Sequence, residues 1–238
     1  MIFYEWGVEM VTIKRLWNDY KHFALLSLYG VLYLWFYYLE RTVVPEYDMF
    51  SPLDHKIPFI KEFVIPYLFW YIYMAFGFVY LGIVSKKDYY RLFLFMFIGM
   101  SVCYAVYGIF PNGQSLRPVI TGDDIFSRTM KYIYATDTPT NVAPSIHVLN
   151  SIAIHIGLMG YEPFKKNRGL KLVSLIIMVT ISASTVLVKQ HSILDGIWAI
   201  ALSIVLYVGI YVVPDFIGER KEVGVENTKA SVSTQKGI

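Results

Sequence analysis

Three short clusters of polar residues could do chemistry together, and each adjoins a strongly apolar stretch. They are Gln114–Ser115–Leu116–Arg117–Pro118, Pro144–Ser145–Ile146–His147, and the stretch from Ser184 to Asp195, which contains Lys189 and His191. Between them they offer two imidazoles, one carboxylate, two cations and the start of a helix. These are the groups that metal-free phosphoryl transfer needs, because it requires a nucleophile, a proton donor and positive charge near the phosphoryl oxygens.

His191 and Asp195 are the pair with the most specific spacing. They lie four residues apart, so they share one face if a helix starts there. A carboxylate bonded to one imidazole nitrogen fixes the tautomer and raises the basicity of the other nitrogen. The spacing therefore predicts that His191 is a nucleophile oriented by Asp195, and it leaves His147 free to act as the general acid.

Four residues are candidates for binding the phosphate. Ser145 is a favoured helix N-cap, and the helix that follows it would present unpaired N–H groups and its positive dipole end to an anion. Arg117 can hold two phosphoryl oxygens at once, Lys189 can supply a point charge, and Ser184 completes the set. Three of them have a structural alternative: Arg117 as an ordinary loop residue, Lys189 as a lysine reaching the membrane interface, and Ser184 as a small residue between packed helices.

The composition is that of a membrane protein. Of the 238 residues, 56% are hydrophobic and 16% are charged, and the mean hydropathy is +0.48; soluble domains average about 25% charged residues. The net charge of +3 is too small to indicate a nucleic-acid partner. The single cysteine, Cys103, excludes an internal disulfide, and its apolar neighbours predict a buried packing role.

Six apolar stretches position the polar clusters. A spanning helix needs about 20 apolar residues, and the expected spans are Phe23–Leu39, Pro66–Val84, Leu92–Phe110, Ile146–Tyr161, Leu172–Val188 and Leu194–Val213. The fourth is short and carries several polar side chains, which inside a span mark a functional interior. One of them, His155, could act as a proton relay or make an internal hydrogen bond. The predicted fold is all-α, a polytopic membrane protein with six transmembrane helices in a bundle.

The basic residues predict the orientation. Residues 1–22 form an N-terminal segment, either cytoplasmic or lying in the interface, residues 23–213 the six-helix domain, and residues 214–238 a polar tail that we expect to be disordered. Of the 21 Lys and Arg residues, 14 lie in the two terminal segments and around the loops after the second and fourth spans. Because basic residues favour the cytoplasmic side, both termini are expected there. The three polar clusters would then share the extracytoplasmic face of the cell membrane.

The loop before the second span lies on the same predicted face. Its Asp54 and His55 could line a headgroup pocket, or they could cap and fold the loop itself. Asp123 and Asp124 indicate a turn after Gly122 rather than a pair of metal ligands.

The order Arg-Pro, Pro-Ser-x-His and Ser-x6-His-x3-Asp on a six-helix membrane core resembles the type 2 phosphatidic acid phosphatase superfamily, whose soluble relatives include vanadium haloperoxidases. The resemblance implies that His191 forms a phosphohistidine, that Asp195 orients it, and that His147 protonates the leaving oxygen. It also implies two phosphate ligands, Arg117 and Ser145.

The chain departs from the family motifs at three positions. Phe110 stands where the first motif has Lys, Ile146 where the second has Gly, and Thr185 where the third has Arg. Two phosphate-binding cations of the family are therefore missing, and Lys189 could replace one of them. The stretch from Asp137 to Asn141 is similar to the inositolphosphoryl-ceramide synthase branch, whose members transfer a phospho-headgroup between lipids.

These features leave three functions open. The first is a phosphatase acting on a lipid phosphate or pyrophosphate in the outer leaflet. The second is a lipid headgroup phosphotransferase. The third is a proton-coupled transporter with the histidines as relays; inverted repeats would favour it, and the sequence contains no convincing repeat. For the two enzymes we expect no cofactor and no metal, because the sequence has no carboxylate cluster suited to one.

Overall fold

The computed structural model describes residues 13–218 and is mostly helical. Helix accounts for 75% of these residues and strand for 2%. The helices are α1 (Ile13–Tyr20), η1 (Lys21–Leu28), α2 (Tyr29–Thr42), η2 (Lys61–Phe63), α3 (Val64–Val84), α4 (Lys86–Ile109), α5 (Ile125–Thr136), α6 (Ile146–Gly160), α7 (Glu162–Lys166), α8 (Arg168–Leu187), α9 (Ile193–Tyr207) and the π-helical η3 (Val208–Val212). The strands are β1 (Tyr47–Asp48) and β2 (Asn112–Gly113).

Five described helices are long and apolar enough to cross a membrane. They are Trp17–Thr42, Lys61–Val84, Lys86–Ile109, Arg168–Leu187 and Ile193–Gly218. The expected fourth span is α6, which is apolar but has only 15 residues, a length of about 22 Å at 1.5 Å per residue. The all-α class and the apolar helices are thus confirmed, whereas five helices, not six, have the length of a span.

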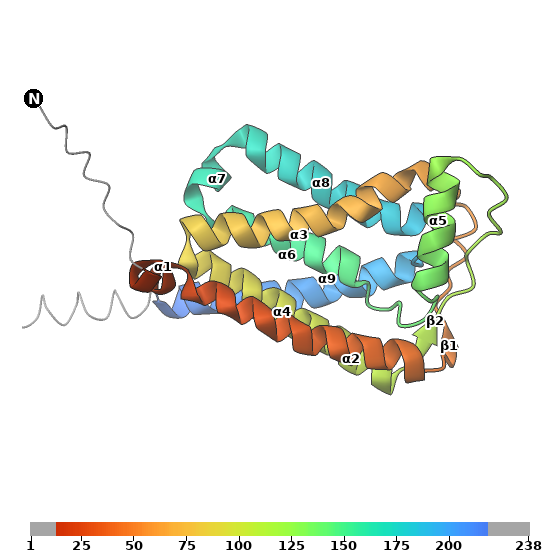
Figure 1. Cartoon of the computed structure of the whole chain (residues 1–238), viewed down its shortest axis with the longest axis horizontal. Coiled ribbons are helices and arrows are strands. Elements are labelled where there is room, and N and C mark those ends of the chain that lie inside the picture. The colour runs from red at the N-terminus through yellow and green to blue at the C-terminus, as the bar shows by residue number, and fades with distance from the viewer. Residues whose placement is uncertain (1–12, 219–238) are drawn as a thin grey trace, which may run out of the picture.

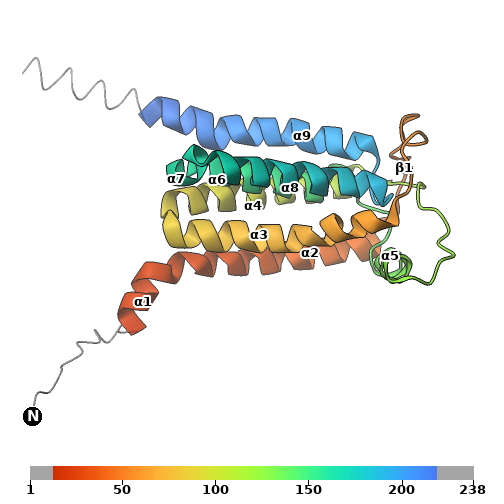
Figure 2. The same ribbon diagram turned by 90° about the horizontal axis from the view of Figure 1, so that it is seen from above.

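The long helices α2, α3, α4, α8 and α9 run side by side along one axis, and α6 lies among them (Figures 1 and 2). It packs against α3, α4, α8 and α9. The polar Asn150 and Ser151 of α6 are therefore fully buried in protein. Close packing relies on small residues: a Cβ on Gly77 of α3 would lie 2.5 Å from Ile154, and one on Gly99 of α4 would lie 2.7 Å from Leu149. Cys103 is buried as predicted.

Loops gather at the end of the bundle where α5 lies (Figure 1). There β1 pairs in parallel with β2, Tyr47 opposite Asn112 and Asp48 opposite Gly113. Gly113 also bridges to Thr140. A Cβ on Gly113 would lie 2.8 Å from the Pro139 carbonyl oxygen, so only glycine allows this approach. The small sheet therefore joins the loops that follow α2, α4 and α5.

Described helices extend past both predicted terminal boundaries, which themselves stay predictions. The first long helix begins at Trp17, inside the predicted N-terminal segment 1–22, because His22 is buried and its Nε2 bonds to the Gly82 carbonyl at 2.8 Å. The last helix continues to Gly218, past the predicted start of the disordered tail at residue 214, because Asp215 is held by Arg91. Residues 1–12 and 219–238, with the rest of these two predictions, lie outside the described residues.

Candidate active site

His191 and Asp195 are hydrogen-bonded at the start of α9. Ser192 is the N-cap, and it forms a capping box with Asp195. One carboxylate oxygen of Asp195, Oδ2, accepts from the Ser192 backbone N–H at 2.9 Å and lies 3.1 Å from His191 Nδ1. His191 is 7% exposed and Asp195 is fully buried. With Nδ1–H donating to this carboxylate, the Nε2 atom of His191 carries the free lone pair.

His147 occupies the first turn of α6, beside His191. Its ring lies between Tyr67, stacked at 4.5 Å, and Trp70 at 4.4 Å, both from α3. The His147 and His191 rings meet edge to face with centroids 5.7 Å apart. Within the described residues, the buried Nδ1 of His147 has no hydrogen-bond partner. The two histidines predicted from separate clusters therefore lie together.

Ser145 is the N-cap of α6, as predicted. Its Oγ accepts from the Val148 N–H at 3.5 Å, a distance at the long limit for a hydrogen bond. Its own N–H donates to the Asp195 carbonyl at 3.1 Å. This hydrogen bond joins the start of α6 to the start of α9 and so keeps the two histidines close to each other.

A small cavity of about 30 Å³ lies against both imidazoles. Space of this size holds only one or two waters, so a phosphoryl group enters only after lining side chains move. Among the described residues that line it, none is Lys or Arg. The lining residues are Phe36, Asp137, Thr138, Thr140, Asn141, Val142, Ile146, His147, Gln190 and His191.

Arg117 lies one layer behind this cavity. Its guanidinium donates to the Asp137 carbonyl at 2.7 Å, bonds to the Gln190 side chain, and covers the ring of Tyr134 at 4.6 Å. Burial lowers the pKa of Arg117, and the nearby Asp137 carboxylate opposes that shift. Arg117, which the sequence predicts to bind phosphate, thus links the segment after α5 to Gln190, the residue before His191.

Lys189 and Ser184 are not brought to the cavity. The Lys189 ammonium donates to the backbone carbonyls of Asp54 at 2.8 Å and Ile57 at 2.6 Å. Burial lowers the pKa of Lys189, and Asp54 partly opposes the shift. Ser184 is buried in α8 and donates to the Ile181 carbonyl at 2.6 Å. The contact of Ser184 supports its structural alternative, a small residue between packed helices. Lys189 is buried against loop carbonyls, so here it neither lines the cavity nor reaches out to a membrane interface.

The comparisons with family models, with curated proteins and with solved structures found no match for this chain. Its function therefore rests on the chemistry of the site. In the described part of the chain, no three His, Cys, Asp or Glu side chains gather closely enough to hold a metal ion.

Asn112 is a positioning residue that the sequence alone does not reveal. It is fully buried, and its Oδ1 accepts from the N–H groups of Val142 at 2.9 Å and Ala143 at 2.8 Å. Its Nδ2 donates to the Ala143 carbonyl at 3.0 Å. Two residues on, Gln114 donates to the Lys189 carbonyl at 3.0 Å. The loop after α4 therefore holds both segments that carry the histidines, yet Pro-Asn-Gly in sequence indicates only a turn.

Asp54 is a second positioning residue, and its contacts support capping rather than a headgroup pocket. Its carboxylate accepts from the Ser192 hydroxyl at 2.6 Å and from the Ile193 N–H at 2.9 Å. These bonds satisfy the N-terminus of α9 next to His191. His55 beside it is exposed and packs on Phe50.

Asp137 is the one carboxylate that lines the cavity among the described residues. Burial raises its pKa, the Glu40 carboxylate adds to the shift, and Arg117 and His191 oppose it. Its Oδ2 accepts from Gln190 Nε2 at 3.3 Å. In the sequence Asp137 is distinguished only as the first residue of the stretch Asp137–Asn141, and nothing there indicates a role for its carboxylate.

Proposed function

We propose that this chain is an integral membrane phosphatase that acts on a lipid phosphate or pyrophosphate through a phosphohistidine at His191. One observation carries the proposal: the imidazole of His191, bonded to the buried Asp195, and the imidazole of His147 line the same cavity. A nucleophile oriented by a third group, with a second imidazole in reach, fits the requirements of covalent phosphoryl transfer. The resemblance to the type 2 phosphatidic acid phosphatases supports the same roles.

In the first step, Nε2 of His191 attacks phosphorus in line and the bond to the leaving oxygen breaks. His147 gives its proton to that oxygen, so a neutral alcohol or a protonated phosphate departs. The new phosphohistidine keeps its proton on Nδ1, where the Asp195 carboxylate stabilises the positive ring. In the second step, His147 takes a proton from water as the water attacks phosphorus. This step releases inorganic phosphate and restores both histidines.

The phosphoryl oxygens need donors and positive charge. Gln190 and the N-terminus of α6 supply donors beside the cavity, and Arg117 lies directly behind Gln190. We expect a bound phosphate to replace the Gln190 side chain on Arg117, which would bring the guanidinium to the phosphate. The same movement would enlarge the cavity.

The test is phosphate release from a panel of lipid phosphates by the purified chain, with a chelator and no added metal. Activity should persist, and His191→Ala and His147→Ala should each abolish it, whereas His55→Ala at the same end of the molecule should not. Labelling with a substrate carrying radioactive phosphorus should give an acid-labile, base-stable adduct that His191→Ala lacks. Near wild-type activity of His191→Ala, or full dependence on a divalent metal, would contradict the proposal.

Transfer to an alcohol is a second candidate for the final step. Phe36 and Ile146 give the cavity an apolar wall. Such a site favours an acceptor that brings its own hydroxyl on an apolar body. Adding a lipid alcohol to the assay distinguishes the two reactions, because transfer yields a new phospholipid at the expense of free phosphate.

A further inference from the structure

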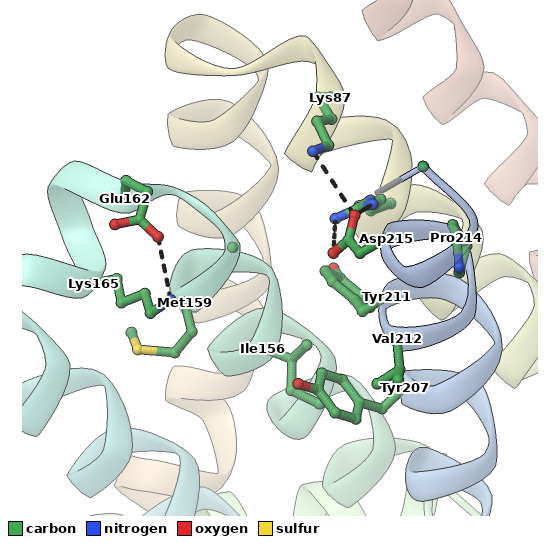
Figure 3. Close-up of a pocket in the computed structure, with 13 residues that line it drawn as sticks. Lys87, Ile156, Met159, Glu162, Lys165, Tyr207, Tyr211, Val212, Pro214 and Asp215 are labelled. Carbon is green, nitrogen blue, oxygen red and sulfur yellow. Dashed lines mark hydrogen bonds and ion pairs between the residues drawn. The ribbon is translucent and has the colours of Figure 1, made fainter. Parts of the chain in front are cut away.

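A much larger cavity lies at the end of the bundle opposite the histidines. Its volume is about 940 Å³, and it is bounded by α4, α6, α7 and the end of the last helix (Figure 3). Ligand pockets usually measure about 300–1,000 Å³. The proposed phosphatase chemistry uses no residue of this cavity, so its role has to be sought separately.

Charged residues form the rim of this cavity. Arg91 and Lys87 of α4 pair with Asp215, the Lys87 pair being 4.0 Å long, and across the space Lys165 of α7 pairs with Glu162 at 3.2 Å (Figure 3). The lining thus has three cations against two carboxylates. Both carboxylates are about half exposed, so an incoming anion can compete for Lys87 and Lys165 at small cost. Arg91 donates to Asp215 through both terminal nitrogens, so a ligand phosphate has to share this guanidinium with Asp215 or displace it.

Tyr211 is a buried polar group in the wall of the cavity that lacks a partner. It is 5% exposed, and no described residue makes a hydrogen bond with its hydroxyl. The Arg91 guanidinium lies over its ring at 5.3 Å. Tyr211 belongs to the π-helical stretch Val208–Val212, and π-helical turns are frequent at functional sites. A buried hydroxyl without a partner costs free energy, which a ligand oxygen at this position would recover.

The wall of the cavity also contains apolar residues, among them Ile156, Met159 and Val212. The cavity lies where α4 begins and α6 ends, at the boundary of the apolar helices (Figure 1). A cationic rim above an apolar wall at such a boundary matches an anionic headgroup joined to a hydrocarbon chain. The basic residues predict that this end faces the cytoplasm, where anionic lipids are enriched.

We infer that this cavity binds the headgroup of an anionic phospholipid. Its phosphate oxygens accept from Arg91 and Lys165, one oxygen accepts from the Tyr211 hydroxyl, and the first part of the acyl chains lies against Ile156 and Met159. Free phosphate shares the headgroup chemistry, but it would leave the apolar wall uncovered. The site is separate from the two histidines, so the inference does not depend on the proposed phosphatase.

The experiment is native mass spectrometry of the full chain in detergent, titrated with phosphatidylglycerol or with phosphatidylcholine of the same acyl chains. We expect one saturable phosphatidylglycerol adduct per chain and much weaker phosphatidylcholine binding. Losing a charge-assisted contact should weaken the adduct roughly tenfold in Arg91→Gln and Lys165→Gln, and losing one neutral hydrogen bond should weaken it about threefold in Tyr211→Phe.

Lys166→Gln is the matched control. Lys166 lies next to Lys165 and carries the same charge, but its side chain is 79% exposed and it does not line the cavity. Its adduct should equal that of the wild type. If Arg91→Gln does not fold, as judged by size-exclusion chromatography, the lipid affinity of Tyr211→Phe tests the inference in its place.

Equal binding of both lipids, an unchanged adduct in Tyr211→Phe and Lys165→Gln, or equal loss in Lys166→Gln would each overturn the inference. Displacement of the lipid by equimolar inorganic phosphate would also overturn it, because the site would then bind a free anion and not a lipid.

Discussion

Asp195 serves two neighbours with one oxygen. Its Oδ2 accepts from the Ser192 backbone, which caps α9, and from the imidazole of His191. The hydrogen bond from the Ser192 backbone at the start of α9 therefore holds this carboxylate in place, and the carboxylate in turn orients His191. A side chain held from two directions keeps the imidazole in one tautomer, which the proposed attack by Nε2 requires.

Asp195→Asn separates these two roles. An amide keeps the shape of the carboxylate but does not stabilise an imidazolium, so kcat should fall by about 10³–10⁴. The measurement is kcat for lipid-phosphate hydrolysis together with thermal unfolding. Ser192→Ala is the control, since it removes the hydroxyl cap at a cost of about 1 kcal/mol but leaves the His191 contact. Equal kcat losses in the two variants would argue against a role for Asp195 beyond capping.

Asp137 makes stability depend on pH. Burial raises its pKa above the ordinary value of 3.8, so between 3.8 and the folded pKa the folded chain binds the proton more tightly than the unfolded chain. Stability is therefore highest below this window and falls as pH rises through it. Asp137→Asn removes the charge and should raise Tm at pH 7 by about 2–4 °C, with the difference vanishing near pH 4. Thermal unfolding between pH 4 and pH 7 tests this, and parallel curves for the two proteins would refute it.

At the scale of elements, the loop after α4 determines where both histidines lie. Asn112 holds the segment that leads into α6, and Gln114 holds the turn before His191. Neither side chain lines the cavity. Both side chains act by bonding to the backbone. Their loss should therefore shift the positions of the histidines without changing the reactivity of the imidazoles.

Asn112→Ala leaves buried N–H and carbonyl groups of Ala143 without their partner, and each such group costs about 1–3 kcal/mol. We expect a lower Tm and a lower kcat, with the nucleophile still chemically competent. Asn167→Ala is the control: Asn167 caps α8 at the other end of the bundle through the Leu170 N–H, so it should lower stability by about 1 kcal/mol and leave kcat unchanged. A normal kcat in Asn112→Ala would show that the loop does not position the histidines.

Spacing within one helix is enough to predict some of these contacts. The interval of four residues predicts the pairing of His191 with Asp195, and the Pro-Ser pair predicts the helix start at Ile146. Contacts between loops are different, because which carbonyl meets a cation depends on how both loops fold. For that reason the sequence predicts Arg117 and Lys189 as phosphate ligands, whereas the structure places them on backbone carbonyls.

The helices extend beyond the predicted spans for a related reason. Hydropathy ends each predicted span where polar residues begin, but helical hydrogen bonds continue through polar residues that find partners. The helix that contains the second predicted span thus begins at Lys61, before Pro66, and the helix that contains the last one reaches Gly218, past Val213. The apolar stretches themselves lie where the sequence predicts them.

At the scale of the molecule, α6 is the short element of the bundle. At about 22 Å it does not cover a hydrocarbon core of about 30 Å. If α6 spans the membrane, the segment before it has to make up the difference with irregular backbone, which membranes tolerate only where protein buries it. Asn141, Val142, Ala143 and Ser145 are all buried. The candidate site would therefore lie below the membrane surface, at a depth where a lipid phosphate can reach it from the side.

This architecture makes a topology prediction. If α6 crosses together with the five longer helices, the loop after α2 and the loop after α6 lie on opposite sides of the membrane. Lys56 and Lys166 are both exposed. Each substitution, Lys56→Cys and Lys166→Cys, made in a Cys103→Ser background, shows on which side of the membrane its loop lies. With a membrane-impermeant maleimide on intact cells, residue 56 should be labelled at once and residue 166 only after permeabilisation, because the 166 side carries most of the basic residues.

The two ways in which this labelling can fail have different meanings. Labelling of both positions from outside would mean that α6 does not cross. Residue 166 would then lie on the side opposite Lys87 and Arg91, which contradicts the large cavity that these segments line together. Labelling of residue 166 alone would mean that the bundle is inverted, which would place the proposed phosphatase site in the cytoplasm and the lipid cavity in the outer leaflet. In the second case the chemistry of both sites would stand, but each would meet the lipids of the other leaflet.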